Sequence, residues 1–426
     1  MITLAVLGIV FVVLLILGVP IAFSLAASST LGLWLMGKPL ATFSIAVFQG
    51  MESWVLLAVP SFIFAGAVME RCGISYNLID FARSLVGWVR GGLGMTTIAG
   101  EILFSGISGS TIADVSAIAS IMGPPMVKAG YKPEHTASII AGATCLGILI
   151  PPAIFMIVIG TQTATSVVGI FLGAILPGLA AGGMMMLLIY VQAIRLKWPI
   201  DAKPSLAWFL RATKGAALAL AMPVVILGGF RAGYFTATEA GAVCAAYAFL
   251  VAVGAYHNMG LKDMWPIALD TAILTAAVVF LLGTATVYQY IMASLGVPEF
   301  FVAMFANLSP LMSLLIVSFI TLLFGLVMEG LPAAVILLPV VFPVIVAKGI
   351  HPIHFCVVLT LASSIGLFLP PTGAGLLLCL RLTRIPLTKG FLLAYLPYAL
   401  TVLSALMLII LVPWLSLVLP LGAGIK

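Results

Sequence analysis

The chain has 426 residues, of which 63% are hydrophobic and 7% are charged, and its net charge is +6. A soluble surface needs about 25% charged residues, so this composition excludes a soluble globular protein. The apolar segments have helix length and do not alternate like barrel strands, which predicts an all-α polytopic membrane protein. The basic residues lie in short connections, so the charge indicates membrane topology and not nucleic-acid binding.

Apolar stretches follow one another along the whole chain, at 2–19, 20–36, 51–70, 95–127, 137–162, 167–192, 216–230, 234–256, 266–293, 311–347, 355–380 and 391–418. Two of them, 95–127 and 311–347, are longer than the roughly 20 residues of one span and too short for two. Small or polar residues lie at their middles, from Ser105 to Thr111 and from Gly325 to Gly330. We predict that each is a re-entrant hairpin of two half-length helices, which requires protein or water to satisfy its irregular backbone.

Two further segments contain a helix break. Gly147 to Pro152 reads Gly-Ile-Leu-Ile-Pro-Pro, and Gly366 to Pro371, 219 residues later, reads Gly-Leu-Phe-Leu-Pro-Pro. Proline removes a backbone donor and clashes with the preceding turn, so each pair should interrupt a membrane helix. Paired breaks at membrane depth are the best sequence pointer to the binding site of a transporter.

The chain consists of two copies of one design. Of the eleven Gly and Pro positions from 106 to 152, seven recur identically 219 residues later. The chain crosses the membrane five times between the start of the span 20–36 and the start of its counterpart 234–256. Because five is odd, the second copy begins on the opposite side of the membrane, and we expect two inverted structural repeats. This expectation depends most on the segment 216–230, since without that short span the two copies would be parallel.

The distribution of basic residues sets the orientation. The most basic connection holds Arg195, Lys197, Lys203, Arg211 and Lys214, and we therefore place it in the cytoplasm. On this orientation the first hairpin opens from the cytoplasm and the second opens from the outside.

The predicted breaks and hairpin tips suit two kinds of ligand. Helix N-termini offer free N–H groups to a carboxylate, whereas freed carbonyls and hydroxyls suit a hard cation such as Na⁺. Ionisable residues at membrane depth are functional by default, which draws attention to Asp114 and Glu329. Asp114 could equally support the hydroxyls of the tip, and we interpret Glu101 as an interfacial residue without a role. We find no catalytic arrangement and predict that the chain is not an enzyme, so an ion gradient should supply the energy.

The chain resembles a known family in several motifs. It is similar to the large membrane subunit (DctM-like) of tripartite ATP-independent periplasmic (TRAP) transporters at Val59 to Gly66, Arg90 to Gly94, Gly106 to Ser110, Ala113-Asp114, Gly130-Tyr131 and Ile150 to Pro152. The resemblance implies a Na⁺-coupled secondary importer of organic acids, such as sialic acid or a four-carbon dicarboxylate, that works by an elevator motion. It also implies a bacterial inner-membrane location, a separate four-helix membrane subunit and a periplasmic substrate-binding protein.

The resemblance also implies a division of the chain. Residues 95–163 and 311–382 would form the transport domain, and residues 1–94, 164–310 and 383–426 would form the scaffold. We predict Na⁺ ligands in both tips and both breaks, at Ser105, Gly106, Ser108, Gly109, Gly147, Ile150, Pro152, Gly325, Glu329, Gly330, Gly366 and Thr372, with Asp114 in support. We predict a substrate site between them, at Ser108, Ser110, Thr111, Thr372 and Gly373.

Two alternatives stay open at this point. A stand-alone Na⁺-coupled anion carrier of similar architecture would not need a binding protein. A membrane scaffold or receptor that transports nothing would have no reason to place paired breaks and hydroxyl-rich tips at membrane depth.

Overall fold

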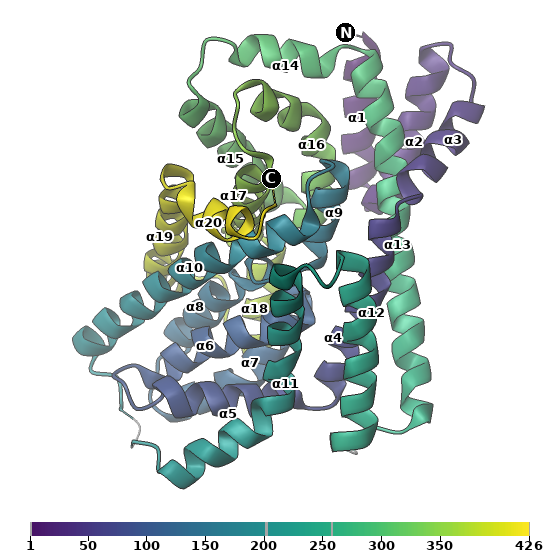
Figure 1. Ribbon diagram of the computed structural model, residues 1–426. Coiled ribbons are helices and arrows are strands. Elements are labelled where there is room, and N and C mark those ends of the chain that lie inside the picture. Colours follow the sequence, from purple (N-terminus) through teal and green to yellow (C-terminus); the bar gives the residue numbers. More distant parts are fainter. Residues whose placement is uncertain (1, 201–202, 257–258, 426) are drawn as a thin grey trace.

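The computed structural model describes residues 2–200, 203–256 and 259–425, and this part of the chain is helical without strands (Figure 1). Eight of its helices are long and apolar enough to cross a membrane, or nine if one bent pair counts as a span. The prediction of an all-α polytopic membrane protein is therefore confirmed.

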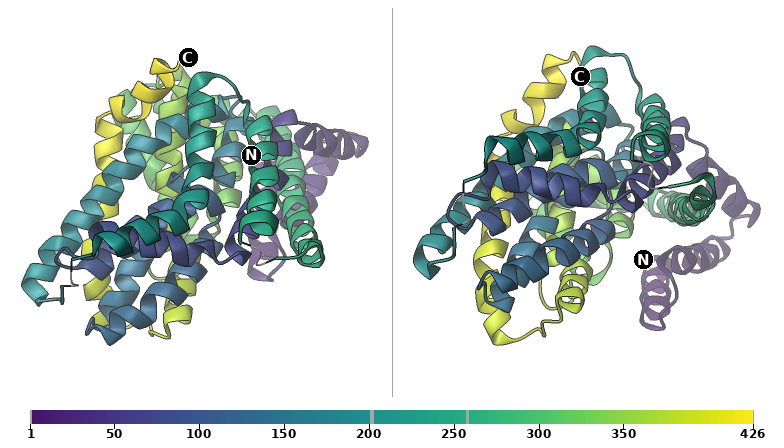
Figure 2. Two further views of the ribbon diagram at one scale, coloured as in Figure 1. Left: turned by 60° about the horizontal axis from the view of Figure 1, so that its bottom comes forward. Right: turned by 90° about the horizontal axis from the view of Figure 1, so that it is seen from below.

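The N-terminal helices form one edge of the molecule, where α2 and α3 pack against the long helix α13 (Figure 2). The first helices are α1 (Ile2–Ile16), α2 (Ile21–Leu35), α3 (Ala41–Met51), the short 3₁₀ turn η1 (Trp54–Leu57) with α4 (Ala58–Arg71), and α5 (Ile74–Val86). Helix α5 buries Ile74, Leu78 and Ile79 on one face and is amphipathic, which the apolar stretches did not predict.

Each of the two overlong segments is a pair of helices with a two-residue break. The first pair is α6 (Gly92–Ser108) and α7 (Thr111–Lys128), and the second is α15 (Pro310–Val327) and α16 (Gly330–Ala347). The two helices of each pair contact each other, as in a hairpin. Their arms have 17 or 18 residues, which is about 26 Å at 1.5 Å per residue. Each arm is about half of its predicted segment, and the first helices begin three residues and one residue before the predicted starts at 95 and 311.

Both predicted breaks interrupt a helix. The first lies between α8 (Pro133–Thr144) with the 3₁₀ turn η2 (Gly147–Leu149) and α9 (Ile154–Gln162), and the two halves meet at 42°. The second lies between α17 (Pro352–Phe368) and α18 (Ala374–Thr383). Both Pro-Pro peptide bonds are cis.

The helix boundaries repeat with the same 219-residue offset as the sequence. Helix α7 covers 111–128 and α16 covers 330–347, so both ends differ by 219. Helices α8 and α17 begin at Pro133 and Pro352, which also differ by 219. The offset seen in glycine and proline positions is therefore also seen in the helix boundaries.

The remaining helices surround these elements. They are α10 (Val167–Leu196), α11 (Leu206–Ala232), α12 (Ala237–Leu250) with a π-helical turn (Val251–Tyr256), α13 (Leu261–Ser294), α14 (Val297–Phe305), α19 (Lys389–Leu411) and α20 (Trp414–Gly422). The short predicted span 216–230 lies inside the 27-residue helix α11. Arg195 lies at the end of α10 and Arg211 and Lys214 lie in α11, so the predicted basic connection is partly helical.

Helix α10 shows how the two hairpins are directed. It has 30 residues and spans about 45 Å at 1.5 Å per residue. Gly91, at the open end of the first hairpin, approaches Ile189 and Ala193 near the C-terminus of α10. Ile353, six residues beyond the open end of the second hairpin, approaches Gly169 near the N-terminus of α10. The two hairpins thus open toward opposite ends of one helix.

Candidate functional site

The tip of the first hairpin lies against the first helix break. A Cβ atom on Gly109 would lie 3.0 Å from the carbonyl oxygen of Pro152, and one on Gly106 would lie 3.5 Å from that of Pro151. Gly109 also has a φ of 60°, a left-handed conformation that favours glycine. The contact at Gly109 is tighter than a side chain normally allows, whereas a Cβ on Gly106 would make an ordinary van der Waals contact.

A buried polar cluster lies beside this contact. The hydroxyl of Ser105 lies 2.8 Å from Glu101 Oε1 and 3.1 Å from Asp114 Oδ2, and the hydroxyl of Ser108 donates to Asp114 Oδ1. The side chains of Glu101, Ser105 and Asp114 are fully buried. The interpretation of Glu101 as interfacial was wrong, because neighbouring helices cover α6 around this residue.

The cluster faces the start of the first break. A Cβ atom on Gly147 would lie 2.5 Å from Asp114 Oδ2, 3.0 Å from Glu101 Oε1 and 3.5 Å from Ser105 Oγ. These three oxygens therefore converge on one glycine of the break. Asp114 holds the hydroxyls of the tip, which is the supporting arrangement considered from the sequence.

The tip of the second hairpin meets the second break in the same way. A Cβ atom on Gly366 would lie 2.8 Å from the Cα of Gly325 and 2.7 Å from the carbonyl oxygen of Leu322. The hydroxyl of Thr372 donates to the carbonyl of Leu326 at 2.7 Å and joins the break to the tip. Glu329, in contrast, is exposed and makes no side-chain hydrogen bond as the N-cap of α16.

The two halves also contact each other reciprocally. Helix α7 packs against α18, and α16 packs against α9, where Phe155 approaches Gly330. Ser364 of α17 donates to the carbonyl of Cys145, the residue after α8, and these two positions differ by 219. When a twofold axis relates two copies, each contact from the first copy to the second has a counterpart from the second to the first. The contacts between the two halves follow this pattern.

The predicted residues fall into two groups. The first group gathers at the first tip and break: Ser105, Gly106, Ser108, Gly109, Ser110, Thr111, Asp114, Gly147, Ile150 and Pro152. The second gathers at the second tip and break: Gly325, Glu329, Gly330, Gly366, Thr372 and Gly373. The candidate substrate residues lie at the end of α6, at the start of α7 and just before α18, and α7 and α18 pack together.

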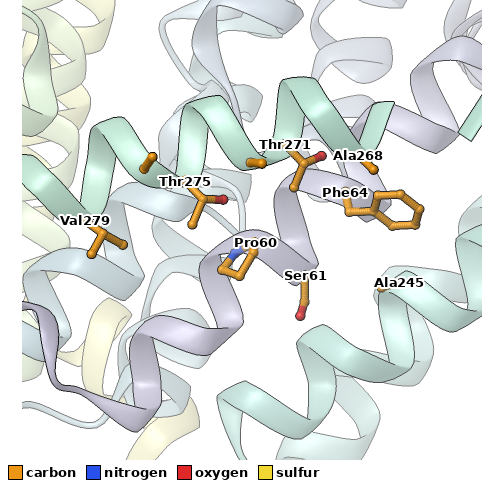
Figure 3. Close-up of a pocket in the computed structure, with 10 residues that line it drawn as sticks. Pro60, Ser61, Phe64, Ala245, Ala268, Thr271, Thr275 and Val279 are labelled. Atoms are coloured by element: carbon orange, nitrogen blue, oxygen red, sulfur yellow. The ribbon is translucent and has the colours of Figure 1, made fainter. Parts of the chain in front are cut away.

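A groove lies away from both groups. It has a volume of about 620 Å³ between α4, α12 and α13, and its lining includes Pro60, Phe64, Thr271 and Val279 (Figure 3). None of the predicted site residues lines it.

Comparison with known proteins identifies the family. The model of the family "Tripartite ATP-independent periplasmic transporter, DctM component" matches residues 8–415. The chain is 36% identical to a C4-dicarboxylate TRAP transporter large permease protein of Pseudomonas aeruginosa, with 90% of each chain covered. It is 33% identical to the 2,3-diketo-L-gulonate large permease protein of Escherichia coli, over 95% of this chain and 96% of the relative. It is 32% identical to the sialic acid large permease protein of Vibrio cholerae, with 96% of each covered.

A solved structure shares the fold. The YdaH transporter of Alcanivorax borkumensis superposes with a TM-score of 0.66 and 16% identity, over 90% of this chain and 89% of that one. The relatives named above are transporter permeases and not enzymes. The chain belongs to the family of the DctM component, the large permease, of tripartite ATP-independent periplasmic transporters.

Proposed function

We propose that this large permease imports a carboxylate-bearing solute across the bacterial inner membrane and that Na⁺ moving down its gradient drives the import. The observation that carries this proposal is the contact of each hairpin tip with a broken helix, at Gly109 with Pro152 and at Gly325 with Gly366. Such contacts bring irregular backbone and hydroxyls together at the depth of the membrane.

The first Na⁺ site lies between the tip of α6 and α7 and the first break. Its ligands are the hydroxyls of Ser105 and Ser108 and backbone oxygens at Gly106, Gly109, Gly147, Ile150 and Pro152. Hard cations prefer such oxygen ligands. The burial of Ser105 and of the break supports this assignment, because a desolvated cation needs a site that excludes competing water.

The second Na⁺ site is the counterpart of the first. Its ligands come from Gly325, Glu329, Gly330, Gly366 and Thr372, of which Thr372 already joins the tip to the break. Glu329 adds a carboxylate that makes no capping hydrogen bond to the backbone of α16.

The solute binds between the two sites. Ser108, Ser110 and Thr111 of the first half and Thr372 and Gly373 of the second lie beside the N-termini of α7 and α18. Helix N-termini favour anions. The names of the relatives include a C4-dicarboxylate, 2,3-diketo-L-gulonate and sialic acid, which all carry a carboxylate.

The two halves are inverted repeats and move as one transport domain past the remaining helices. The opening of the hairpins toward opposite ends of α10 and the reciprocal contacts of α7 with α18 and α9 with α16 support the inversion. A site between inverted halves can face either side after a rigid displacement. A separate four-helix membrane subunit and a periplasmic binding protein complete the transporter.

Uptake by the reconstituted complex tests this function. We would purify the chain with its small subunit, add the binding protein, and offer labelled C4-dicarboxylate, 2,3-diketo-L-gulonate and sialic acid in turn. At least one should accumulate under an inward Na⁺ gradient, and accumulation should stop when K⁺ replaces Na⁺ or when the binding protein is omitted. Uptake that continues unchanged without Na⁺ would refute the coupling, and full uptake without the binding protein would favour a stand-alone carrier.

A further inference from the structure

Exposed basic side chains gather where α5, the end of α10 and the start of α11 come together. Helix α5 and the first half of α11 pack side by side along one edge of the molecule (Figure 1). The ring of Phe81 on α5 lies 6.5 Å from that of Phe209 on α11, and Trp208 Nε1 donates to Asp80 Oδ1 at 3.2 Å. Gly91, just after α5, approaches the C-terminal end of α10. These contacts hold the three elements together as one surface.

Six exposed cations belong to this surface, which we call the cationic surface: Arg90, Arg195, Lys197, Lys203, Arg211 and Lys214. Among the residues that the structure describes, none of the six forms an ion pair with an acidic side chain. The acidic side chain that α5 and α11 do carry, Asp80, is occupied by Trp208. Lys203 Nζ lies 5.7 Å from the centre of the Trp88 ring, which holds the connection before α11 against the end of α5. The protein therefore leaves the positive charge of this surface uncompensated.

Large apolar side chains lie exposed beside these cations. On α11, Leu206 and Leu210 are 73% and 57% exposed. Because a helical turn has 3.6 residues, these two leucines share one side of the exposed face, and Arg211 and Lys214 follow on its other side. Trp88, which is also exposed, lies at the end of the neighbouring helix. Such helices lie in the interface of a bilayer, with the apolar side chains toward the acyl chains and the basic ones toward the headgroups.

We propose that the cationic surface binds the headgroups of anionic phospholipids in the cytoplasmic leaflet. Clusters of basic residues on amphipathic helices attract anionic lipids, and the leucines beside them contact the acyl chains. Charge complementarity selects this partner, because an anionic headgroup neutralises the unpaired cations and a zwitterionic one has no net charge. The proposal goes beyond transport topology, since Arg211 and Lys214 lie on a helix and share its exposed face with leucines.

Bound lipids then act on the first hairpin through α5. This helix ends at Val86, and α6, the first arm of the hairpin, begins at Gly92. Lipids on the cationic surface therefore hold the open end of the hairpin at the surface of the membrane. This binding does not depend on Na⁺ or on the solute, so it stands or falls separately from the proposed function.

Lipid binding to the purified complex tests the proposal. We would titrate the complex in detergent with dioleoyl phosphatidylglycerol or dioleoyl phosphatidylcholine and count bound lipids by native mass spectrometry. The wild type should bind the anionic lipid more tightly than the zwitterionic one. In the double variant Arg211→Gln with Lys214→Gln, affinity for phosphatidylglycerol should fall at least tenfold, since each basic side chain near an anionic surface contributes roughly fivefold. Its phosphatidylcholine binding, and its unfolding temperature in phosphatidylcholine, should equal those of the wild type.

Two matched double variants serve as controls. Lys38→Gln with Arg231→Gln removes two exposed cations that lie between α2 and α3 and in the last turn of α11, and it should keep the preference for phosphatidylglycerol. Arg211→Lys with Lys214→Arg keeps both charges and should also keep it. If the glutamine double variant does not fold, Lys203→Gln, outside the helices, should weaken phosphatidylglycerol binding about fivefold. Equal affinity of the wild type for the two lipids, or an unchanged preference in the glutamine variants, would overturn the inference.

Discussion

Gly147 has the strictest requirement for a small residue in the first site. The nearest atoms to an added Cβ are the oxygens of Asp114 and Glu101, at 2.5 and 3.0 Å. These oxygens belong to buried and hydrogen-bonded side chains, so they have little room to move away. A methyl group here would therefore displace the carboxylates, and with them the hydroxyl of Ser105 that they hold beside the first break.

The substitution Gly147→Ala tests this requirement. We expect at least a tenfold loss of Na⁺-dependent uptake, because the methyl group pushes away the side chains that position the Ser105 ligand of the first proposed Na⁺ site. The control is Gly183→Ala on α10, where an added Cβ has no atom within 4 Å, and it should transport normally. Uptake by Gly147→Ala at the wild-type rate and Na⁺ dependence would show that no ion binds beside this glycine.

At the scale of elements, α15 and α17 form the closest contact between a hairpin and a broken helix in the second half. Gly325 and Gly366 meet there with backbone against backbone. Backbone atoms cannot move aside like the end of a flexible side chain. This contact therefore sets the position of the second tip relative to the second break.

The substitution Gly366→Ala should separate these two helices. An added Cβ would lie 2.7 Å from the Leu322 carbonyl oxygen, and overpacking of this kind costs about 1–3 kcal/mol. We expect a lower unfolding temperature and weaker activation of uptake by Na⁺. Gly228→Ala on α11, whose added Cβ meets nothing within 4 Å, provides the comparison. Equal stability and Na⁺ activation in the two variants would contradict the role of this contact.

The sequence allowed prediction of the helix breaks and hairpin tips, because proline and glycine act on the backbone locally. It did not allow prediction of helices such as α5 from apolar stretches, since a helix at the surface mixes polar and apolar residues. The periodic spacing of Ile74, Leu78 and Ala82 was the available signal. The burial of Glu101 could not be predicted, because it depends on which helices pack around α6.

At the scale of the whole molecule, one of the contacts between the proposed transport domain and scaffold joins α9 and α13. The amide of Gln289 on α13 donates to Gln162 at the end of α9, with an N···O distance of 2.7 Å. If the transport domain slides past the scaffold, this hydrogen bond must break in each cycle. The five native cysteines are buried, so thiols introduced here would be the accessible ones.

A cross-link at this position should arrest transport. We expect the double variant Gln162→Cys and Gln289→Cys to lose uptake after treatment with a short bifunctional thiol reagent that can be cleaved, and to regain it after cleavage. Each single variant should keep its uptake under the same treatment. Full uptake by the cross-linked double variant would mean that α9 and α13 do not move apart.

Coupled movement of Na⁺ and solute is the most direct test of the central claim. The reconstituted complex, with its small subunit and binding protein, would receive ²²Na⁺ and the transported solute on the outside. We expect ²²Na⁺ to enter in a fixed ratio to the solute, and both fluxes to fall together in Gly147→Ala. Solute entry without accompanying ²²Na⁺ would contradict the account.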